Sequence, residues 1–108
     1  MPEFLRIALH PEKCMRRQQT VRLIRPPGAE AGILCIREGA KMSFYAFAEI
    51  PCSIGGRGFA VHRLGLGPLY HVRIGSGLDC SCECLGYLRH GNCKHLRALM
   101  TLADKNLI

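Results

Sequence analysis

The chain has 108 residues, a length typical of one domain with a single modest core. Hydrophobic residues make up 48% of it, but only 6% are aromatic and Trp is absent, so Leu, Ile, Val and Ala must build most of the core. No run reaches the ~18 apolar residues of a transmembrane helix, and no apolar segment follows a charged N-terminus as in a signal peptide. We therefore expect a cytoplasmic protein in a reducing compartment, with no membrane partner.

Basic residues outnumber acidic ones, 15 to 8, which gives a formal net charge of +7. The segment from Lys13 to Arg25, which includes Arg16 and Arg17, contains five of these basic residues and no acid. Such a balance favours polyanionic partners such as nucleic acid. A solvated surface explains the same charges equally well, so both interpretations stay open at this point.

Residues 1–19 carry the weakest pattern, and we expect an irregular or partly helical segment there. From residue 20 to 77, short extended runs alternate with Gly and Pro: "TVRLIR", "ILCIRE", "MSFYAFAEI", "FAVHRL" and "LYHVRI". In the last run Tyr70, Val72 and Ile74 fall on one face and His71 on the other. The pattern predicts about five antiparallel strands in a small curled sheet with one buried face.

Residues 78–108 have a different character, a Cys-rich loop followed by a helical period. Apolar residues recur at i, i+3, i+4 and i+7 in Leu96, Leu99, Met100 and Ala103. This stripe predicts a C-terminal helix packed on the sheet, with Asn92 as its N-cap and with Lys94, Arg97 and Thr101 on the opposite side. The fold class expected for residues 1–108, read as a single domain, is therefore α+β.

Four potential metal ligands fall inside this last region, in the pattern C-x-C-x8-C-x-H: Cys82, Cys84, Cys93 and His95. In a reducing compartment, clustered cysteines are more often metal ligands than disulfides. Three thiolates and one imidazole suit tetrahedral zinc. Residues two apart share a side in an extended segment but diverge by about 200° on a helix. Cys93 should therefore lie at or before the first helical turn, with His95 just inside it.

The same residues resemble a SWIM-type zinc finger. That family has a C-x-C pair, an aromatic residue three positions later and a C-x-H pair, commonly C-K-H, that enters a short apolar helix. Here the aromatic residue is Tyr87 and the second pair includes Lys94. The resemblance covers about the last 35 residues. It implies one structural Zn²⁺ ion and a role in DNA binding or protein interaction.

Two other residues could replace a ligand of this set. Cys80 extends the first pair to C-S-C-E-C, so that Cys80 and Cys82 could form it, and His90 lies close enough to compete for the fourth place. Tyr87 has the family's spacing only from Cys84, which favours Cys82 and Cys84. Tyr87 itself is expected to be a small-core aromatic residue under the finger.

The expected function is nucleic-acid binding, with DNA favoured, through a basic face. The residues proposed to contact nucleic acid are Arg89, Lys94, Arg97, Arg16 and Arg17. The alternative is a protein–protein interaction adaptor in which zinc is purely structural. An enzyme is not expected, because four protein ligands leave no open metal position and no acidic residue adjoins them in a role like that of the Glu in H-x-E or H-E-x-x-H motifs. No small-molecule substrate is expected either.

Overall fold

A computed structural model describes residues 5–6, 19–65, 67–76, 79–91 and 93–108, and all structural statements below concern these residues. Seven strands form one antiparallel sheet in which each strand pairs with the next along the chain. They are β1 (Leu5–Arg6), β2 (Gln19–Arg25), β3 (Gly32–Glu38), β4 (Lys41–Ile50), β5 (Arg57–Arg63), β6 (Leu69–Ile74) and β7 (Cys80–Cys82). Two helices follow, α1 (Leu85–His90) and α2 (Lys94–Asp104). None of the described helices is long and apolar enough to cross a membrane.

The expected α+β class is confirmed, and β2 to β6 correspond to the five predicted runs. The estimate of about five strands missed β1 and β7, because two or three residues are too few to show an alternating pattern. The predicted N-terminal segment 1–19 lies mostly outside the described residues. Its described members belong to strands, Leu5–Arg6 to β1 and Gln19 to β2.

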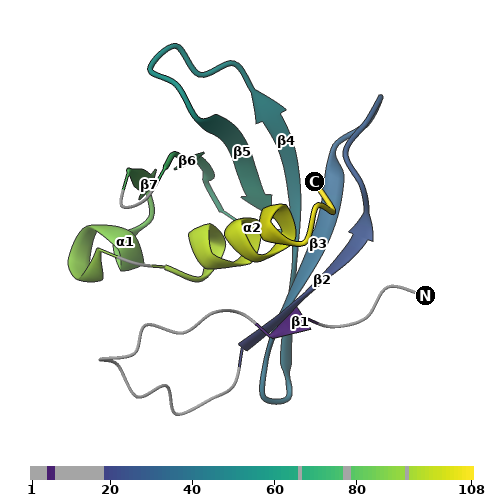
Figure 1. Cartoon of the computed structure of the whole chain (residues 1–108). Coiled ribbons are helices and arrows are strands. Elements are labelled where there is room, and N and C mark those ends of the chain that lie inside the picture. The colour runs from purple at the N-terminus through teal and green to yellow at the C-terminus, as the bar shows by residue number, and fades with distance from the viewer. Residues whose placement is uncertain (1–4, 7–18, 66, 77–78, 92) are drawn as a thin grey trace.

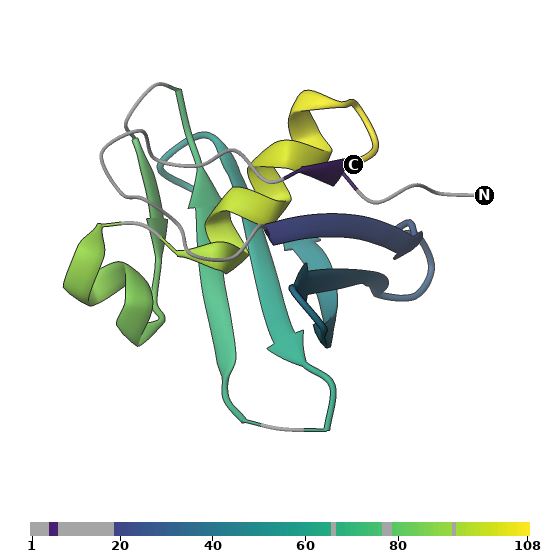
Figure 2. The same ribbon diagram turned by 90° about the horizontal axis from the view of Figure 1, so that it is seen from below.

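Helix α2 lies across the inner face of the sheet, which curls around it (Figures 1 and 2). It contacts β2 near one edge of the sheet and β6 and β7 at the other. A sheet of successive antiparallel strands twists, and the register shift between Leu23 and Arg25 adds to the curvature of β2. The curl gives the small chain one enclosed core.

Alternating residues of the strands fill this core from the sheet side, as the period of two predicts. The largest fully buried side chains of the sheet are Val21, Leu34, Ile36, Tyr45, Phe47, Phe59, Val61 and Val72. Leu96, Leu99 and Leu102 of α2 close the core from the other side. Cys82, Cys84 and Cys93 belong to the same cluster, so the cysteine-rich region is continuous with the core.

Two details of α2 differ from expectation. Its N-cap is Cys93, in an extended conformation, rather than Asn92. Thr101 is buried and Arg97 is partly buried, although both were expected to face away from the sheet. The reason is the curl: the sheet covers more of the helix than one apolar stripe, because α2 contacts both β2 and β6.

The β4–β5 turn allows a backbone test of the fold. Gly56 has φ +75°, and an added Cβ would lie 2.6 Å from the carbonyl oxygen of Ile74. We expect Gly56→Ala to lower the free energy of unfolding by more than about 2 kcal/mol, because left-handed strain and a backbone clash add. Gly55 has φ +91° but no atom within 4 Å of an added Cβ. Gly55→Ala should therefore cost about half as much in urea denaturation. Equal losses of unfolding free energy in the two variants would show that the structure shifts to relieve the clash between the Cβ at position 56 and Ile74.

Candidate metal centre

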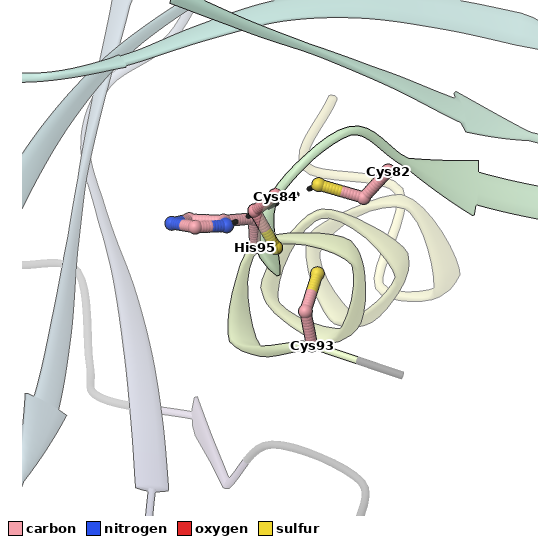
Figure 3. Close-up of side chains that lie close together, drawn as sticks. All are labelled: Cys82, Cys84, Cys93 and His95. Atoms are coloured by element: carbon pink, nitrogen blue, oxygen red, sulfur yellow. Dashed lines mark hydrogen bonds between the residues drawn. The ribbon is translucent and has the colours of Figure 1, made fainter. Parts of the chain in front are cut away.

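The four predicted ligands come from three consecutive elements and meet at one point (Figure 3). Cys82 ends β7, Cys84 precedes α1, Cys93 precedes α2, and His95 lies in the first turn of α2. One donor atom from each residue lies within 4.8 Å of all the others, and all four residues are buried. The expected position of Cys93 before the helix, with His95 just inside it, is confirmed.

Two of the cysteines also begin the helices. Cys84 has extended backbone angles, and its Sγ accepts a hydrogen bond from the backbone N–H of Tyr87 at 3.4 Å. Cys93 does the same for the N–H of Leu96, also at 3.4 Å. A side chain that accepts from the third residue of a helix satisfies a donor that the helix leaves unpaired. The local geometry that starts each helix therefore also aims a sulfur at the common point.

The electrostatics of the cluster favour a thiolate on Cys93. A hydrogen bond with Cys82 lowers the pKa of Cys93 to about 4, against the effect of burial, and further hydrogen bonds from His95 and the N–H of Leu96 act in the same direction. The same bond raises the pKa of Cys82 above its usual range. Thiolate is the form in which cysteine binds a metal ion.

These donors fit zinc. Ligands at about 2.0–2.3 Å from Zn²⁺ lie about 3.3–3.8 Å from one another in a tetrahedron. The four donor atoms here lie within 4.8 Å of one another. Three sulfurs and one imidazole nitrogen form a Cys3His set, typical of a structural zinc site. Cys80 and His90 are not in the group. The Cys80 thiol lies 3.9 Å from the carbonyl oxygen of Gly75, and His90 is exposed at the end of α1.

Comparison with protein families supports the same reading of this region. Residues 70–104 match the family model of the SWIM zinc finger. This part of the chain is similar to a SWIM zinc finger and is called the SWIM finger below. The match begins in β6 and ends with α2, so it includes all four clustered residues. Comparisons with curated proteins and with solved structures gave no match.

Aromatic side chains stabilise the SWIM finger and orient its histidine. The hydroxyl of Tyr87 donates a 2.7 Å hydrogen bond to the carbonyl oxygen of Cys80, which ties α1 to the edge strand β7. Tyr87 packs against the core, as expected. The ring of His95 contacts Tyr45 edge-on at 5.1 Å between ring centroids, and Tyr70 at 5.3 Å. These rings hold the imidazole with Nδ1 toward the cysteines, 4.0 Å from the Sγ of Cys82.

The residues proposed to contact nucleic acid lie in different surroundings. Lys94 of the SWIM finger forms an ion pair with Glu38 at 3.4 Å, and Arg97 donates a 2.7 Å hydrogen bond to Gln19. Gln19 in turn donates to Glu38, so a polar network joins α2 to β2 and β3. Arg89 is exposed on α1. Arg16 and Arg17 lie outside the described residues.

A pocket that was not predicted lies between the N-terminal end of α2, the middle of β4, the end of β5 and the start of β6. It is lined by Tyr45, Arg63, Gly67, Pro68, Tyr70, Lys94 and His95. A signal was present in β5, because Arg63 continues the buried alternation of Phe59 and Val61. A cation at an inward position of a strand is costly to bury unless it has a charged partner or lines a ligand-binding site.

Proposed function

We propose that this protein is a nucleic-acid-binding module, with DNA as the favoured target, built around one structural zinc ion. The observation that carries the proposal is uncompensated positive charge. Four of the acidic side chains are already in ion pairs with Arg or Lys side chains: Glu30, Glu38, Glu49 and Asp79. Three thiolates and Zn²⁺ would change the formal charge of +7 by only about −1. The remaining cations can then pair with phosphates.

A structural role for zinc is supported by what the four residues connect. A metal ion held by them would join β7 to the N-terminal ends of α1 and α2. Four protein ligands would leave no open position for substrate or water, which favours binding over catalysis. Zinc in such a site contributes its binding free energy to folding.

The proposed nucleic-acid surface lies on the finger side of the molecule. Arg89 is exposed on α1, and Arg63 and Lys94 line the pocket that also includes His95. Arg97 is partly buried, and its guanidinium donates a hydrogen bond to Gln19, so we assign it to the contact between α2 and β2 rather than to this surface. Arg16 and Arg17 remain candidates from the sequence alone.

Salt dependence tests this proposal. We expect anisotropy titrations with single- and double-stranded DNA and RNA to show affinity that falls as salt rises, because phosphate contacts release counterions. Arg89→Gln should reduce the slope of log K against log salt by about 1. Arg25→Gln is the matched control, since it removes the same charge at the end of β2, where Arg25 pairs with Glu30. A salt-independent affinity, or equal slopes for both variants, would contradict the proposal.

One observation favours a second function, a protein-interaction adaptor. Helix α1 buries none of its residues, and its two leucines, Leu85 and Leu88, are 65% and 70% exposed. Exposed apolar side chains on one short helix are a feature of docking surfaces. Binding that depends on these leucines and is insensitive to salt would favour this function over nucleic-acid binding.

A further inference from the structure

The pocket beside the finger has a volume of about 260 Å³ and two chemically different walls. The rings of Tyr45 and Tyr70, together with Pro68, supply flat and largely apolar surface. Arg63 and Lys94 supply positive charge, and His95 supplies one edge of its imidazole. Such a combination suits a ligand that carries an anionic group attached to a ring.

The charge of the pocket is only partly neutralised by the protein. Lys94 reaches Glu38 at 3.4 Å, from a partly buried position. No ion pair joins Arg63 to an acidic residue within the described part of the chain. Arg63 is partly buried at the end of β5, where an unpaired guanidinium is costly. A planar guanidinium with a neighbouring ammonium is well suited to bind phosphate oxygens.

His95 adds a donor of fixed orientation. Its Nδ1 faces Cys82, and its other ring nitrogen, Nε2, lies on the far side of the ring from the cysteines (Figure 3). With Nδ1 on the metal, Nε2 carries the proton and seeks an acceptor, as the second nitrogen of metal-bound histidines usually does. Among the described residues no hydrogen-bond acceptor is recorded for it, and His95 lines the pocket.

From these three observations we propose that the pocket binds the phosphate group of a nucleotide. Arg63 and Lys94 contact the phosphate oxygens, Nε2–H of His95 donates to one of them, and the attached sugar or base lies against the tyrosines. The volume exceeds what a bare phosphate needs, and aromatic side chains are common partners for nucleotide rings. The phosphate can belong to a free nucleotide or to a strand, and in the latter case the inference rests on the proposed function.

The experiment uses the zinc-loaded full chain and calorimetric titration with thymidine 5′-monophosphate, with thymidine, and with oligothymidylate with and without a 5′-phosphate. We expect the monophosphate to bind and thymidine to bind at least about tenfold more weakly. Arg63→Gln should weaken monophosphate binding at least about tenfold, since it loses a charge-assisted bidentate contact. Arg25→Gln, at the end of β2 and outside the pocket, should change it less than about twofold.

A second measurement does not depend on the folding of a variant. In the wild-type protein, the imidazole Nε2 resonance of His95 should shift on addition of the monophosphate, and thymidine should leave it in place. Zinc content and melting temperature of Arg63→Gln should match those of the wild type, which would show that its weaker binding is local.

The outcomes separate the pocket from the proposed function. If oligothymidylate binds and Arg63→Gln weakens it more than Arg25→Gln does, a strand is the source of the phosphate. If only the monophosphate binds, the pocket stands, its ligand is a free nucleotide and the proposed function fails. If oligothymidylate binds equally to wild type and Arg63→Gln, with no Nε2 shift, the pocket inference is overturned and the proposed function stands. Absence of binding by every phosphate ligand overturns both.

Discussion

Cys93→Ser is expected to leave the purified protein with well under one zinc ion per chain and to lower its free energy of unfolding by more than about 4 kcal/mol. The Sγ of Cys93 lies within 4.8 Å of the three other donor atoms. Losing one thiolate weakens the binding of the zinc ion. The free energy of zinc binding is part of the free energy of folding, so the protein becomes less stable. Since α2 closes the hydrophobic core, the loss of zinc should destabilise the sheet as well as the finger.

Serine is an informative substitution at this position because Cys93 has two roles. Its Sγ caps α2 by accepting from the N–H of Leu96, and serine is itself a strong N-cap residue. The helix cap should therefore survive in the variant while the thiolate is lost. Metal analysis, circular dichroism and urea denaturation of the same samples measure the effect.

Cys80→Ser is the matched control, because Cys80 lies next to the cluster in the sequence but is not one of the four grouped residues. It should keep one zinc ion per chain and nearly the same stability. Full zinc content in Cys93→Ser would refute the proposed site. Full content in Cys82→Ser together with loss in Cys80→Ser would instead show that Cys80 belongs to the first ligand pair.

Leu99→Ala is expected to lower the free energy of unfolding by about 2–5 kcal/mol. The Leu99 side chain is 0% exposed and lies on the face of α2 that packs against the sheet. Removing most of a buried side chain loses its transfer free energy and leaves a cavity that the close-packed core fills only in part. In a domain of this size such a loss is a large fraction of the total stability.

A second helical leucine provides the comparison. Leu88 on α1 is 70% exposed, so Leu88→Ala should change the free energy of unfolding by less than about 0.5 kcal/mol. Urea denaturation of the zinc-loaded proteins measures both values under two-state conditions. Similar losses for the two variants would mean that α2 does not close the core as described.

The helical period predicted that Leu99 is buried, but the exposure of Leu88 was not readable from the sequence. Leu88 is apolar and lies between the two ligand pairs, one residue after Tyr87. Only Tyr87 turns inward, where its hydroxyl bonds the carbonyl oxygen of Cys80. A six-residue helix presents too few turns for a periodic pattern, so its buried side depends on which neighbour it meets.

The amino-acid sequence by itself determined the local features of this protein: the five longer strands, the buried stripe of α2 and the spacing that brings Cys82, Cys84, Cys93 and His95 together. Each depends on contacts between near neighbours, since strand alternation, helical period and capping repeat within a few residues. Only the tertiary structure decided the rest. It paired Lys94 with Glu38 and Arg97 with Gln19 across long stretches of chain, and it placed Arg63 beside His95. Those placements follow from how far the sheet curls around α2, and no local pattern encodes that.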